Sequence, residues 1–457
     1  MNPRPTKPTE PSGPPSAPDS AALREAATDV ARRLQAAGHE AFWVGGCVRD
    51  FLLGREPADY DLATSARPAQ VEALFSRTLP VGRQFGVMLV RHRGAEFQVA
   101  TFRAEADYTD GRRPDRVEFT HARADAQRRD FTINGLFHDP VRGVTHDWVG
   151  GEADLRRRLV RTIGDPRERF AEDRLRPLRA VRFAARLGFT IEHGTLAAIR
   201  EQPGLIRSVS AERVRDELLK LFRPPHAARG LELLRDSGLL AVVLPEVAAF
   251  IGCAQPPEFH PEGDVFEHVR LMLDQLPADA PPALPWAVLL HDVGKPATAT
   301  RDPDTGRIRF HGHDQVGAEL AEKILRRLRF PRRQIEEIVT VVRHHMQLAD
   351  APRMRRAKLR RLLLRPTFPL ELELHRLDCL GSDHSLELHD FLTREAAALA
   401  ERPRLRPPLV NGHDLMALGI PPGPELGRWL REIRDRQLAE ELTTREAALN
   451  WVKKQLP

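Results

Sequence analysis

A short glycine-containing segment, Val44–Asp50, places the strongest constraint on what this chain can fold into. The apolar run Ala41–Val44 predicts a strand, and Gly45 and Gly46 follow it directly. Glycine has no Cβ atom, so the N–H groups of such a turn can approach an anion closely, with the N-terminus of the next helix behind them. The segment therefore predicts an α/β unit that can bind a phosphate group.

Two carboxylates, Asp59 and Asp61, stand at the start of the next apolar segment. Side chains alternate along a strand, so both are expected to project from the same face and to share a divalent metal ion. An isolated Asp-x-Asp usually belongs to a turn or a solvated face. The order of the two motifs and their short separation favour a site for phosphate chemistry.

The length and the apolar pattern limit the class of protein. The chain has 457 residues, which predicts two to four domains, and no apolar run approaches the roughly 18 residues of a membrane helix. Residues 1–21 are rich in Pro, Ser and Thr and are expected to be a disordered tail rather than a signal peptide. Cys47, Cys253 and Cys379 are scattered, which favours a reduced, cytoplasmic setting.

Basic residues are in modest excess, since 70 Lys and Arg stand against 64 Asp and Glu. The resulting pI of about 9.6 suits a polyanionic partner but is weak evidence by itself. One dense cluster, residues 353–365, predicts a helix with a basic face. A solvated face explains that helix at least as well as a contact with RNA.

Two regions of different periodicity follow the tail. Residues 22 to about 150 combine apolar runs of strand length with turns that contain Gly and Pro. The expected strands are Ala41–Val44, Tyr60–Ala63, Gly86–Arg91 and Glu96–Phe102. From about Asp154 onward, apolar residues recur at spacings of three and four, which predicts helices almost throughout. The predicted fold class is α+β, with a small α/β head and a long helical body.

Six motifs occur in order along the first half of the chain. They are Gly45-Gly46-Cys47-Val48-Arg49-Asp50, Asp59-Tyr60-Asp61-Leu62-Ala63-Thr64, Val99-Ala100-Thr101-Phe102-Arg103, Asp110-Gly111-Arg112-Arg113-Pro114, Arg128-Arg129-Asp130-Phe131-Thr132-Ile133-Asn134-Gly135 and Glu172-Asp173-Arg174-Leu175-Arg176. Together they resemble the class II tRNA nucleotidyltransferase and bacterial poly(A) polymerase family, within the DNA polymerase beta superfamily. The resemblance covers residues 22–225 and continues less sharply to the C-terminus. It implies a DNA polymerase beta-like nucleotidyltransferase head followed by an all-helical body.

The resemblance implies attack of an RNA 3′-hydroxyl on the α-phosphate of a nucleoside triphosphate, with two metal ions held by Asp59 and Asp61. Backbone donors and guanidinium groups suit the phosphate oxygens. The implied nucleotide contacts are Gly46, Arg49, Arg129, Arg179 and Arg182. For Arg179 and Arg182, an exposed basic stripe is the alternative explanation of their spacing.

Asp173 and Arg176 are three residues apart on a predicted helix, so their side chains are expected to converge on one object. Cytosine and adenine share an exocyclic amine beside a ring-nitrogen acceptor, which a carboxylate and a guanidinium can recognise together. Uracil and guanine present the opposite polarity at those places. The resemblance implies that this pair selects the base in place of a nucleic acid template, and an intrahelical salt bridge is the alternative.

The chain departs from the family pattern at Gln98. The family usually has a third carboxylate just before the Val-x-Thr-x-Arg segment. An amide can hydrogen-bond a hydroxyl or ligate a metal weakly through its oxygen, but it has no charge and cannot take a proton. Glu96 lies two residues earlier on the same strand face, roughly 7 Å away. Either residue is a candidate for the role, and the departure concerns the rate and the metal preference more than the reaction class.

A second group of residues, in the body, suits a divalent metal such as Ni²⁺ or Mn²⁺. It consists of His268, His291, Asp292 and Asp378. The segment His291-Asp292-Val293-Gly294-Lys295 resembles the signature of the HD phosphohydrolase domain, which is fused to many bacterial members of the tRNA enzyme family. His313 and His344 are candidates for extending the site to two metals, and surface or satisfied histidines explain them equally well.

The resemblance as a whole implies an enzyme that adds or repairs the 3′-terminal CCA of tRNA, with tRNA, CTP and ATP as partners, Mg²⁺ in the head and a phosphate-trimming HD unit. A poly(A) polymerase or an A-adding enzyme is the nearest alternative. An HD phosphohydrolase with an RNA-binding head is an alternative from another class. After the tail, the expected domains are the head at 22–155, a nucleotide-recognition and RNA-binding region at 156–255, the HD domain at 256–402 and a helical tail at 403–457.

Overall fold

A computed structural model describes residues 20–82, 85–106, 116–258, 260–382, 385–400, 407–438 and 441–456. These residues belong to two compact units, which divide between Val209 and Ser210. The motif Asp110–Pro114 and most of the predicted tail lie outside the described residues. Within the described ranges, no helix combines the length and the apolar character that crossing a membrane requires.

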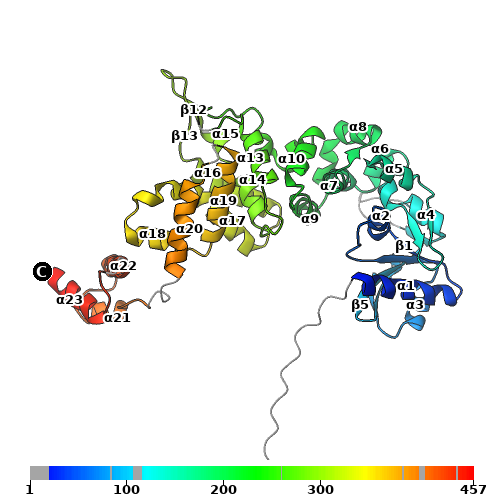
Figure 1. Ribbon diagram of the computed structural model, residues 1–457, viewed down its shortest axis with the longest axis horizontal. Helices are drawn as coiled ribbons and strands as arrows, with labels where there is room; N and C mark the ends of the chain where they lie inside the picture. The colour runs from blue at the N-terminus through cyan, green and yellow to red at the C-terminus, as the bar shows by residue number, and fades with distance from the viewer. Residues whose placement is uncertain are drawn as a thin grey trace, which may run out of the picture. The chain divides into compact units, whose positions relative to one another are not determined.

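A seven-stranded sheet organises the first unit (Figure 1). Its strands are β1 (Ala41–Val44), β2 (Asp61–Thr64), β3 (Thr78–Gly82), β4 (Val87–His92), β5 (Ala95–Thr101), β8 (Phe137–Asp139) and β9 (Val144–His146). Their order is β3-β4-β5-β2-β1-β8-β9, and β2 and β5 are parallel while the other neighbours are antiparallel. The four predicted strands are confirmed, each displaced by no more than one residue.

Strand β1, an interior strand of the sheet, is apolar throughout, and both of its faces are covered. On one face Phe42 packs against Phe102 and Phe137. On the other, Trp43 packs against Tyr60 and against Phe51 of α2 (Gly46–Leu52). Burial of β1 therefore fixes the position of the glycine turn that follows it.

Helices and short strands complete the first unit. They are α1 (Ser20–Ala36), α3 (Pro68–Leu74), β6 (Arg103–Ala106), β7 (Arg116–Phe119), α4 (Ala122–Gln127), η2 (Thr132–Asn134), α5 (Gly151–Arg157), β10 (Leu159–Val160), α6 (Pro166–Glu172), α7 (Arg176–Leu187), β11 (Thr190–Ile191), α8 (His193–Glu201) and η3 (Pro203–Ser208). α7 has the predicted apolar periodicity, since Leu178 and Val181 are fully buried, and it ends at Gly188, whose φ of 70° closes the helix.

The second unit is almost entirely helical, as predicted. Its elements are α9 (Ala211–Leu221), α10 (Ala227–Asp236), α11 (Leu240–Val243), α12 (Pro245–Ala248), α13 (Val265–Asp274), α14 (Leu284–Leu290), α15 (Lys295–Thr298), β12 (Ala299–Arg301), β13 (Ile308–Phe310), α16 (His313–Arg327), α17 (Arg332–His344), η4 (His345–Arg353), α18 (Arg356–Leu363), α19 (Phe368–Gly381), α20 (Glu387–Ala400), α21 (Gly412–Met416), α22 (Pro424–Leu438) and α23 (Arg445–Gln455). The helices α13, α17 and α19 all pack against α14, which is buried along its whole length (Figure 1).

The predicted basic helix at 353–365 is shorter than expected. η4 ends at Arg353, and α18 covers Arg356–Leu363. Arg360 is buried, and its guanidinium donates to the carbonyl of Leu438 at the end of α22. One arginine of the cluster therefore stabilises the fold and is not available to RNA.

Candidate active sites

The carboxylates Asp59 and Asp61 lie next to the glycine turn of the first unit. In the sheet, Asp61 pairs with Val44, the last residue of β1 before Gly45. Asp59 and Asp61 are exposed, whereas Tyr60 between them is only 2% exposed. This alternation agrees with the prediction that both carboxylates project from one face.

The charges around Asp61 suit a bound cation. Desolvation of its carboxyl raises the pKa of Asp61, repulsion from Asp59 adds to the rise, and the charge of Arg129 opposes both. A divalent ion beside the two carboxylates would stabilise the ionised form of Asp61. Because both supply only oxygen atoms, the pair fits Mg²⁺.

Gln98 lies beside this pair. β2 and β5 are parallel, and Gln98 is the register partner of Asp61, so their side chains project from the same face. Glu96 is engaged elsewhere, because its Oε1 accepts a hydrogen bond from Nε of Arg91 at 2.6 Å. Of the two candidates for the third position, Gln98 is therefore the one that adjoins Asp61.

Two arginines lie against the glycine turn. Gly45 has a φ of 75°, a conformation that residues with a Cβ rarely adopt. A Cβ on Gly45 would lie 3.2 Å from Nη1 of Arg129, and one on Gly46 would lie 3.6 Å from Nη2 of Arg49. The open backbone and the two guanidinium groups form a site suited to a polyphosphate.

A hydrogen-bond network links two of the predicted nucleotide contacts, Arg49 and Arg179. Arg49 donates to both carboxylate oxygens of Asp50, at 2.9 and 3.0 Å, and to Oδ1 of Asn134 at 2.8 Å. The amide of Asn134 donates to Asp130 at 3.1 Å, and Asp130 accepts from Nε and Nη2 of Arg179 at 3.0 and 2.6 Å. Burial alone would raise the pKa of Asp130, but the charge and hydrogen bonds of Arg179 lower it to about 2. Asp130 and Asn134 belong to the motif at residues 128–135, but the motif alone does not predict their role in this network.

The ring of Phe183 in α7 gathers three of the predicted nucleotide contacts. The guanidinium carbons of Arg49 and Arg179 each lie 5.4 Å from the ring centroid, and that of Arg182 lies at 3.9 Å. Cations at these distances are attracted by the electrons of the ring. Arg179 and Arg182 are both partly buried, which favours the predicted contacts over an exposed basic stripe.

The predicted helix that carries both Asp173 and Arg176 is wrong. α6 ends at Glu172, Asp173 has an extended backbone (φ −133°, ψ 105°), and α7 begins at Arg176. The reason is Pro177, which has no N–H to donate to the carbonyl of Asp173 and which favours the first turn of a new helix. The side chain of Asp173 instead accepts a hydrogen bond from the N–H of Leu175 at 3.1 Å.

Arg176 is buried, and its guanidinium is bonded within the first unit. Nη1 donates to Glu172 at 2.6 Å and to the carbonyl of Arg169 at 3.0 Å, and Nη2 donates to the carbonyl of Arg128 at 3.2 Å. Its salt bridge therefore joins it to Glu172. The contact with the Arg128 carbonyl places Arg176 next to the motif that contains Arg129 and Asp130.

The second unit brings together all four residues predicted to bind metal there. His268 lies on α13, His291 and Asp292 follow α14, and Asp378 lies on α19. Nε2 of His268 is 3.0 Å from Oδ1 of Asp378, and Nε2 of His291 is 3.1 Å from Oδ2 of Asp292. Three of the ligand atoms, those of His268, His291 and Asp378, lie within 4.8 Å of one another.

A second set of ligand atoms shares Asp292. Oδ1 of Asp292 is 3.5 Å from Nε2 of His313 and 4.0 Å from Nε2 of His345. The prediction for His344 is corrected, because Nδ1 of that residue instead lies 3.9 Å from the buried Glu371. Successive residues at the end of α17 point in different directions, so only one of the two histidines can face Asp292.

The glycine in the His-Asp-Val-Gly-Lys segment makes this approach possible. A Cβ on Gly294 would lie 2.2 Å from the carbonyl oxygen of His313 and 2.7 Å from the backbone nitrogen of Gly317. Only glycine allows the backbones of α15 and α16 to come this close. His313, the first residue of α16, thereby reaches Asp292.

Backbone carbonyls fix the tautomer of three of the histidines. Each of their Nδ1 atoms lies 2.6 to 2.8 Å from a carbonyl oxygen: His291 to Val288, His313 to Phe310 and His345 to Val342. A carbonyl only accepts, so Nδ1 carries the proton and Nε2 keeps its lone pair. This is the tautomer that binds a metal through Nε2.

Two buried polar atoms of this centre lack hydrogen-bond partners among the described residues, as expected of metal ligands. Nε2 of His268 and Oδ2 of Asp292 are buried, and neither forms a hydrogen bond of normal geometry with any residue that the structure describes. Buried polar atoms are nearly always paired. Lys295, whose Nζ lies 2.7 Å from Oδ2 of Asp292, supplies a positive charge to that carboxylate. Imidazole and carboxylate atoms together suit a divalent transition metal.

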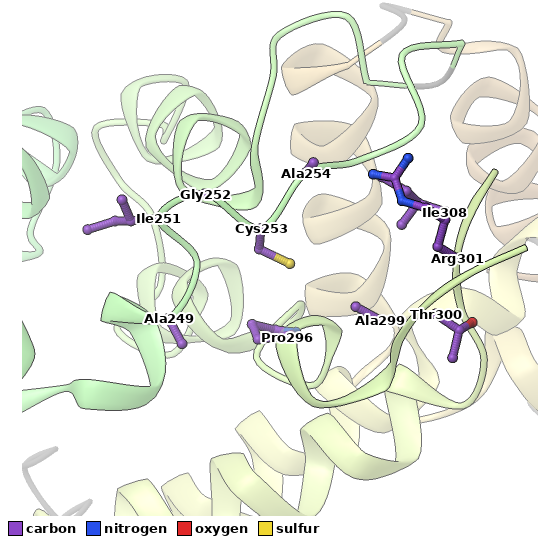
Figure 2. Close-up of a pocket in the computed structure, with 10 residues that line it drawn as sticks. All are labelled: Ala249, Ile251, Gly252, Cys253, Ala254, Pro296, Ala299, Thr300, Arg301 and Ile308. Carbon is purple, nitrogen blue, oxygen red and sulfur yellow. The ribbon is translucent and has the colours of Figure 1, made fainter. Parts of the chain in front are cut away.

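A cavity of about 420 Å³ lies in the second unit, between residues 249–254 and 296–308 (Figure 2). Ile251, Cys253 and Pro296 line it, and Arg301 adds a cation. The adjoining residues Gln255 and Lys295 are hydrogen-bonded to each other at 2.6 Å. Two lining residues, Ala254 and Pro296, are the chain neighbours of this pair, and Lys295 in turn contacts Asp292.

Family models match three parts of the chain. A poly(A) polymerase head domain matches residues 41–161, a probable RNA- and SrmB-binding site of polymerase A matches 188–251, and an HD domain matches 264–381. The three matches account for the glycine turn with its carboxylates, the helices after α7 and the histidine centre.

Full-length relatives and a solved structure are similar to the chain. The A-adding tRNA nucleotidyltransferase of Deinococcus radiodurans is 40% identical over 427 residues, which cover 90% of this chain and 94% of that protein. The CC-adding tRNA nucleotidyltransferase of Thermus thermophilus is 36% identical over 429 residues, with 90% and 92% covered. The Bacillus stearothermophilus CCA-adding enzyme, crystallised with CTP, superposes with a TM-score of 0.71 at 29% identity, covering 94% of this chain and 97% of that one.

Proposed function

Because the chain belongs to the tRNA nucleotidyltransferase and poly(A) polymerase family, we propose that its head adds nucleotides to the 3′ end of tRNA and completes or repairs the terminal CCA. The observation that carries the proposal is the placement of Asp59 and Asp61 beside a glycine turn that Arg49 and Arg129 flank. Metal dependence is a property of the family, and the oxygen ligands of this pair suit Mg²⁺. CTP and ATP are the proposed substrates.

The proposed reaction is an in-line displacement at phosphorus. The tRNA 3′-oxygen bonds to the α-phosphorus, the bond from that phosphorus to the bridging oxygen breaks, and pyrophosphate leaves while the hydroxyl proton passes to solvent. Mg²⁺ bound at Asp59 and Asp61 would neutralise charge on the triphosphate. Arg49 and Arg129 hold the triphosphate against the turn. The hydrogen bonds through Asn134 and Asp130 fix the position of Arg49 relative to Arg179 on α7.

Addition of A alone is a second candidate function. The A-adding relative from D. radiodurans supports it, since the similarity covers nearly all of both chains. The site residues described above are the same for both functions, because each requires a triphosphate, a metal and a tRNA 3′-hydroxyl. The acceptor end therefore distinguishes them.

Three tRNA transcripts, ending before CC, before the second C and before A, separate these functions. Each is incubated with labelled CTP or ATP and Mg²⁺, and the products are resolved at single-nucleotide length. CCA addition predicts CMP on the first two and one AMP on the third. AMP on the third transcript alone indicates the A-adding enzyme, and long A tracts on all three indicate a poly(A) polymerase. Failure on every transcript would contradict a working head.

Changes at Arg176 and Asp173 test the proposed selection of the base. We expect Arg176→Ala and Asp173→Ala to slow the use of CTP and ATP. We also expect weaker discrimination against UTP and GTP, because the altered site no longer places a charged group against a base atom of the wrong hydrogen-bonding polarity. Single-turnover rates with each triphosphate measure the effect. Arg174→Ala, two residues from Arg176, is the matched control. Unchanged selectivity in both variants rules out base selection by this pair.

Gln98→Glu tests the neutral side chain beside Asp61. A third negative charge beside the divalent ions should raise the rate of incorporation or lower the Mg²⁺ concentration at half-maximal rate. Glu96→Ala should be harmless, because Glu96 pairs with Arg91. A titration of rate against Mg²⁺ measures both variants. A slower Gln98→Glu enzyme would show that the site works best with two carboxylates.

For the HD domain we propose metal-dependent hydrolysis of phosphate groups, including cyclic phosphate, at damaged RNA 3′ ends. The four-residue centre around Asp292 supports this proposal, and Mn²⁺ or Ni²⁺ suits its mixed nitrogen and oxygen ligands. The cavity in Figure 2 is lined by Pro296, the residue after Lys295, and by Arg301, whose guanidinium suits a phosphodiester backbone.

A further inference from the structure

We propose, on the basis of the metal centre proposed above, that Glu262 is a positioning residue for the metal ligand His268 and that it orients the neighbouring His260 in the same way. Three histidines of the centre bond Nδ1 to a backbone carbonyl. His268 differs, because its Nδ1 lies 2.8 Å from a side-chain atom, Oε1 of Glu262. The metal affinity of this one ligand is therefore under the control of another side chain.

Glu262 is a buried carboxylate that faces two imidazole rings. Its side chain is 6% exposed, and Oε1 accepts from Nδ1 of His260 at 2.9 Å as well as from His268. Its other oxygen, Oε2, is buried and forms no hydrogen bond within the described ranges. The two imidazole N–H groups share Oε1 as their acceptor, so this buried carboxylate fixes the orientation of both rings.

Backbone hydrogen bonds define the turn that carries Glu262. Gly263, with a φ of 122°, reverses the chain, and its N–H donates to the carbonyl of His260 at 3.3 Å. Asp264 then fixes the start of α13, because it accepts from the N–H of Glu267 at 2.9 Å and from that of Gly252 at 2.7 Å. Hydrogen bonds on both sides of Glu262 therefore fix the backbone that carries its carboxylate.

Two consequences follow for the histidines. A carboxylate on Nδ1 makes Nε2 of His268 more basic and fixes the ring so that Nε2 faces Asp378, 3.0 Å away. The same acceptor places the proton of His260 on Nδ1, which leaves the Nε2 lone pair free to accept a hydrogen bond. The His260 ring centroid lies 4.9 Å from that of His268, and its side chain is 16% exposed. His260 therefore presents an acceptor at the solvent edge of the centre.

A separate metal held by His260, Glu262 and His268 is the competing explanation, since their ligand atoms also lie within 4.8 Å of one another. Such an ion would occupy Nδ1 of His268 in place of its proton. The two explanations differ in what loss of Glu262 changes. Positioning alters the affinity of the existing site, whereas a separate site alters the number of ions bound.

Titration of the full chain with Co²⁺, followed by visible absorption, tests the proposal. The signal that His291→Ala removes defines the HD centre and separates it from cobalt bound in the head. We expect Glu262→Ala to weaken this His291-dependent binding by about 10- to 100-fold at unchanged stoichiometry. Glu262→Gln, which keeps an acceptor but no charge, should lie between Glu262→Ala and the unaltered protein. Glu258→Gln, at an exposed carboxylate four residues away, is the matched control and should change nothing.

Each outcome has a distinct meaning. If the unaltered protein shows no His291-dependent signal, the metal centre itself is wrong. If that signal is present and both Glu262 variants keep the original affinity, the centre stands and the positioning role is wrong. Loss of one bound ion with unchanged affinity for the rest indicates the separate metal site. Because Glu262→Gln has nearly the same size as the original residue, it tests the role even where Glu262→Ala folds poorly.

Discussion

Asp61→Asn is expected to reduce the incorporation of CMP and AMP into tRNA by several orders of magnitude while binding of tRNA persists. The substitution keeps the size of the side chain but removes one of the two charges that would hold the metal ions. Asp61 is also the residue next to Gln98, so its loss leaves a single carboxylate, Asp59, in this part of the site. Incorporation of labelled nucleotide and a tRNA gel-shift assay measure the two effects separately.

Glu56→Gln provides the control for this experiment. Glu56 is an exposed carboxylate in the segment just before Asp59, so its neutralisation changes the local charge without touching the proposed metal ligands. Its activity should equal that of the unaltered enzyme. Full activity in Asp61→Asn would contradict the metal role of the pair.

His291→Ala is expected to abolish hydrolysis of phosphate ends by the HD domain and to leave nucleotide addition intact. Nδ1 of His291 donates to the carbonyl of Val288, so only its Nε2 is available as a ligand, and alanine removes it. The head has its own carboxylates, in a separate compact unit, so transfer should continue. Release of phosphate from RNA with a 2′,3′-cyclic or 3′-phosphate end, with Mn²⁺ or Ni²⁺, measures the first activity.

The exposed His311, two residues before His313, offers the matched control, and His311→Ala should hydrolyse normally. His291→Gln keeps a side chain of similar length and guards against a loss that is only structural. Hydrolysis that survives in both His291 variants would count against the HD centre. A fall in nucleotide addition together with hydrolysis would also count against a separate HD centre.

Some residues of the two candidate sites could be predicted because they lie close together in the sequence. Gly45, Gly46, Asp59 and Asp61 lie within 17 positions of one another along the chain, and short-range rules of strand alternation and glycine geometry place them. The adjacent His291 and Asp292 likewise predict a metal-binding site. The helical body was predictable since its apolar spacing is regular over long stretches.

Predictions failed where one residue changed the direction of the chain. Pro177 separates α6 from α7, so Asp173 and Arg176 do not share a helix. At the end of α17 the sequence presents His344 and His345 side by side, and only packing against the centre selects His345. Glu262 gave no signal at all, because an isolated Glu in a turn has no characteristic pattern.

The sequence by itself determined the fold class, the order of the motifs and the kinds of ligand atoms, because these depend on side-chain chemistry and on contacts between near neighbours in the chain. Tertiary structure alone decided which distant groups meet: Gln98 beside Asp61, Arg49 linked to Arg179 through Asn134 and Asp130, and His268 bonded to Glu262. The physical reason is that strand register and the closeness of helix packing, as at Gly294, set these distances, and both result from burial across the whole unit.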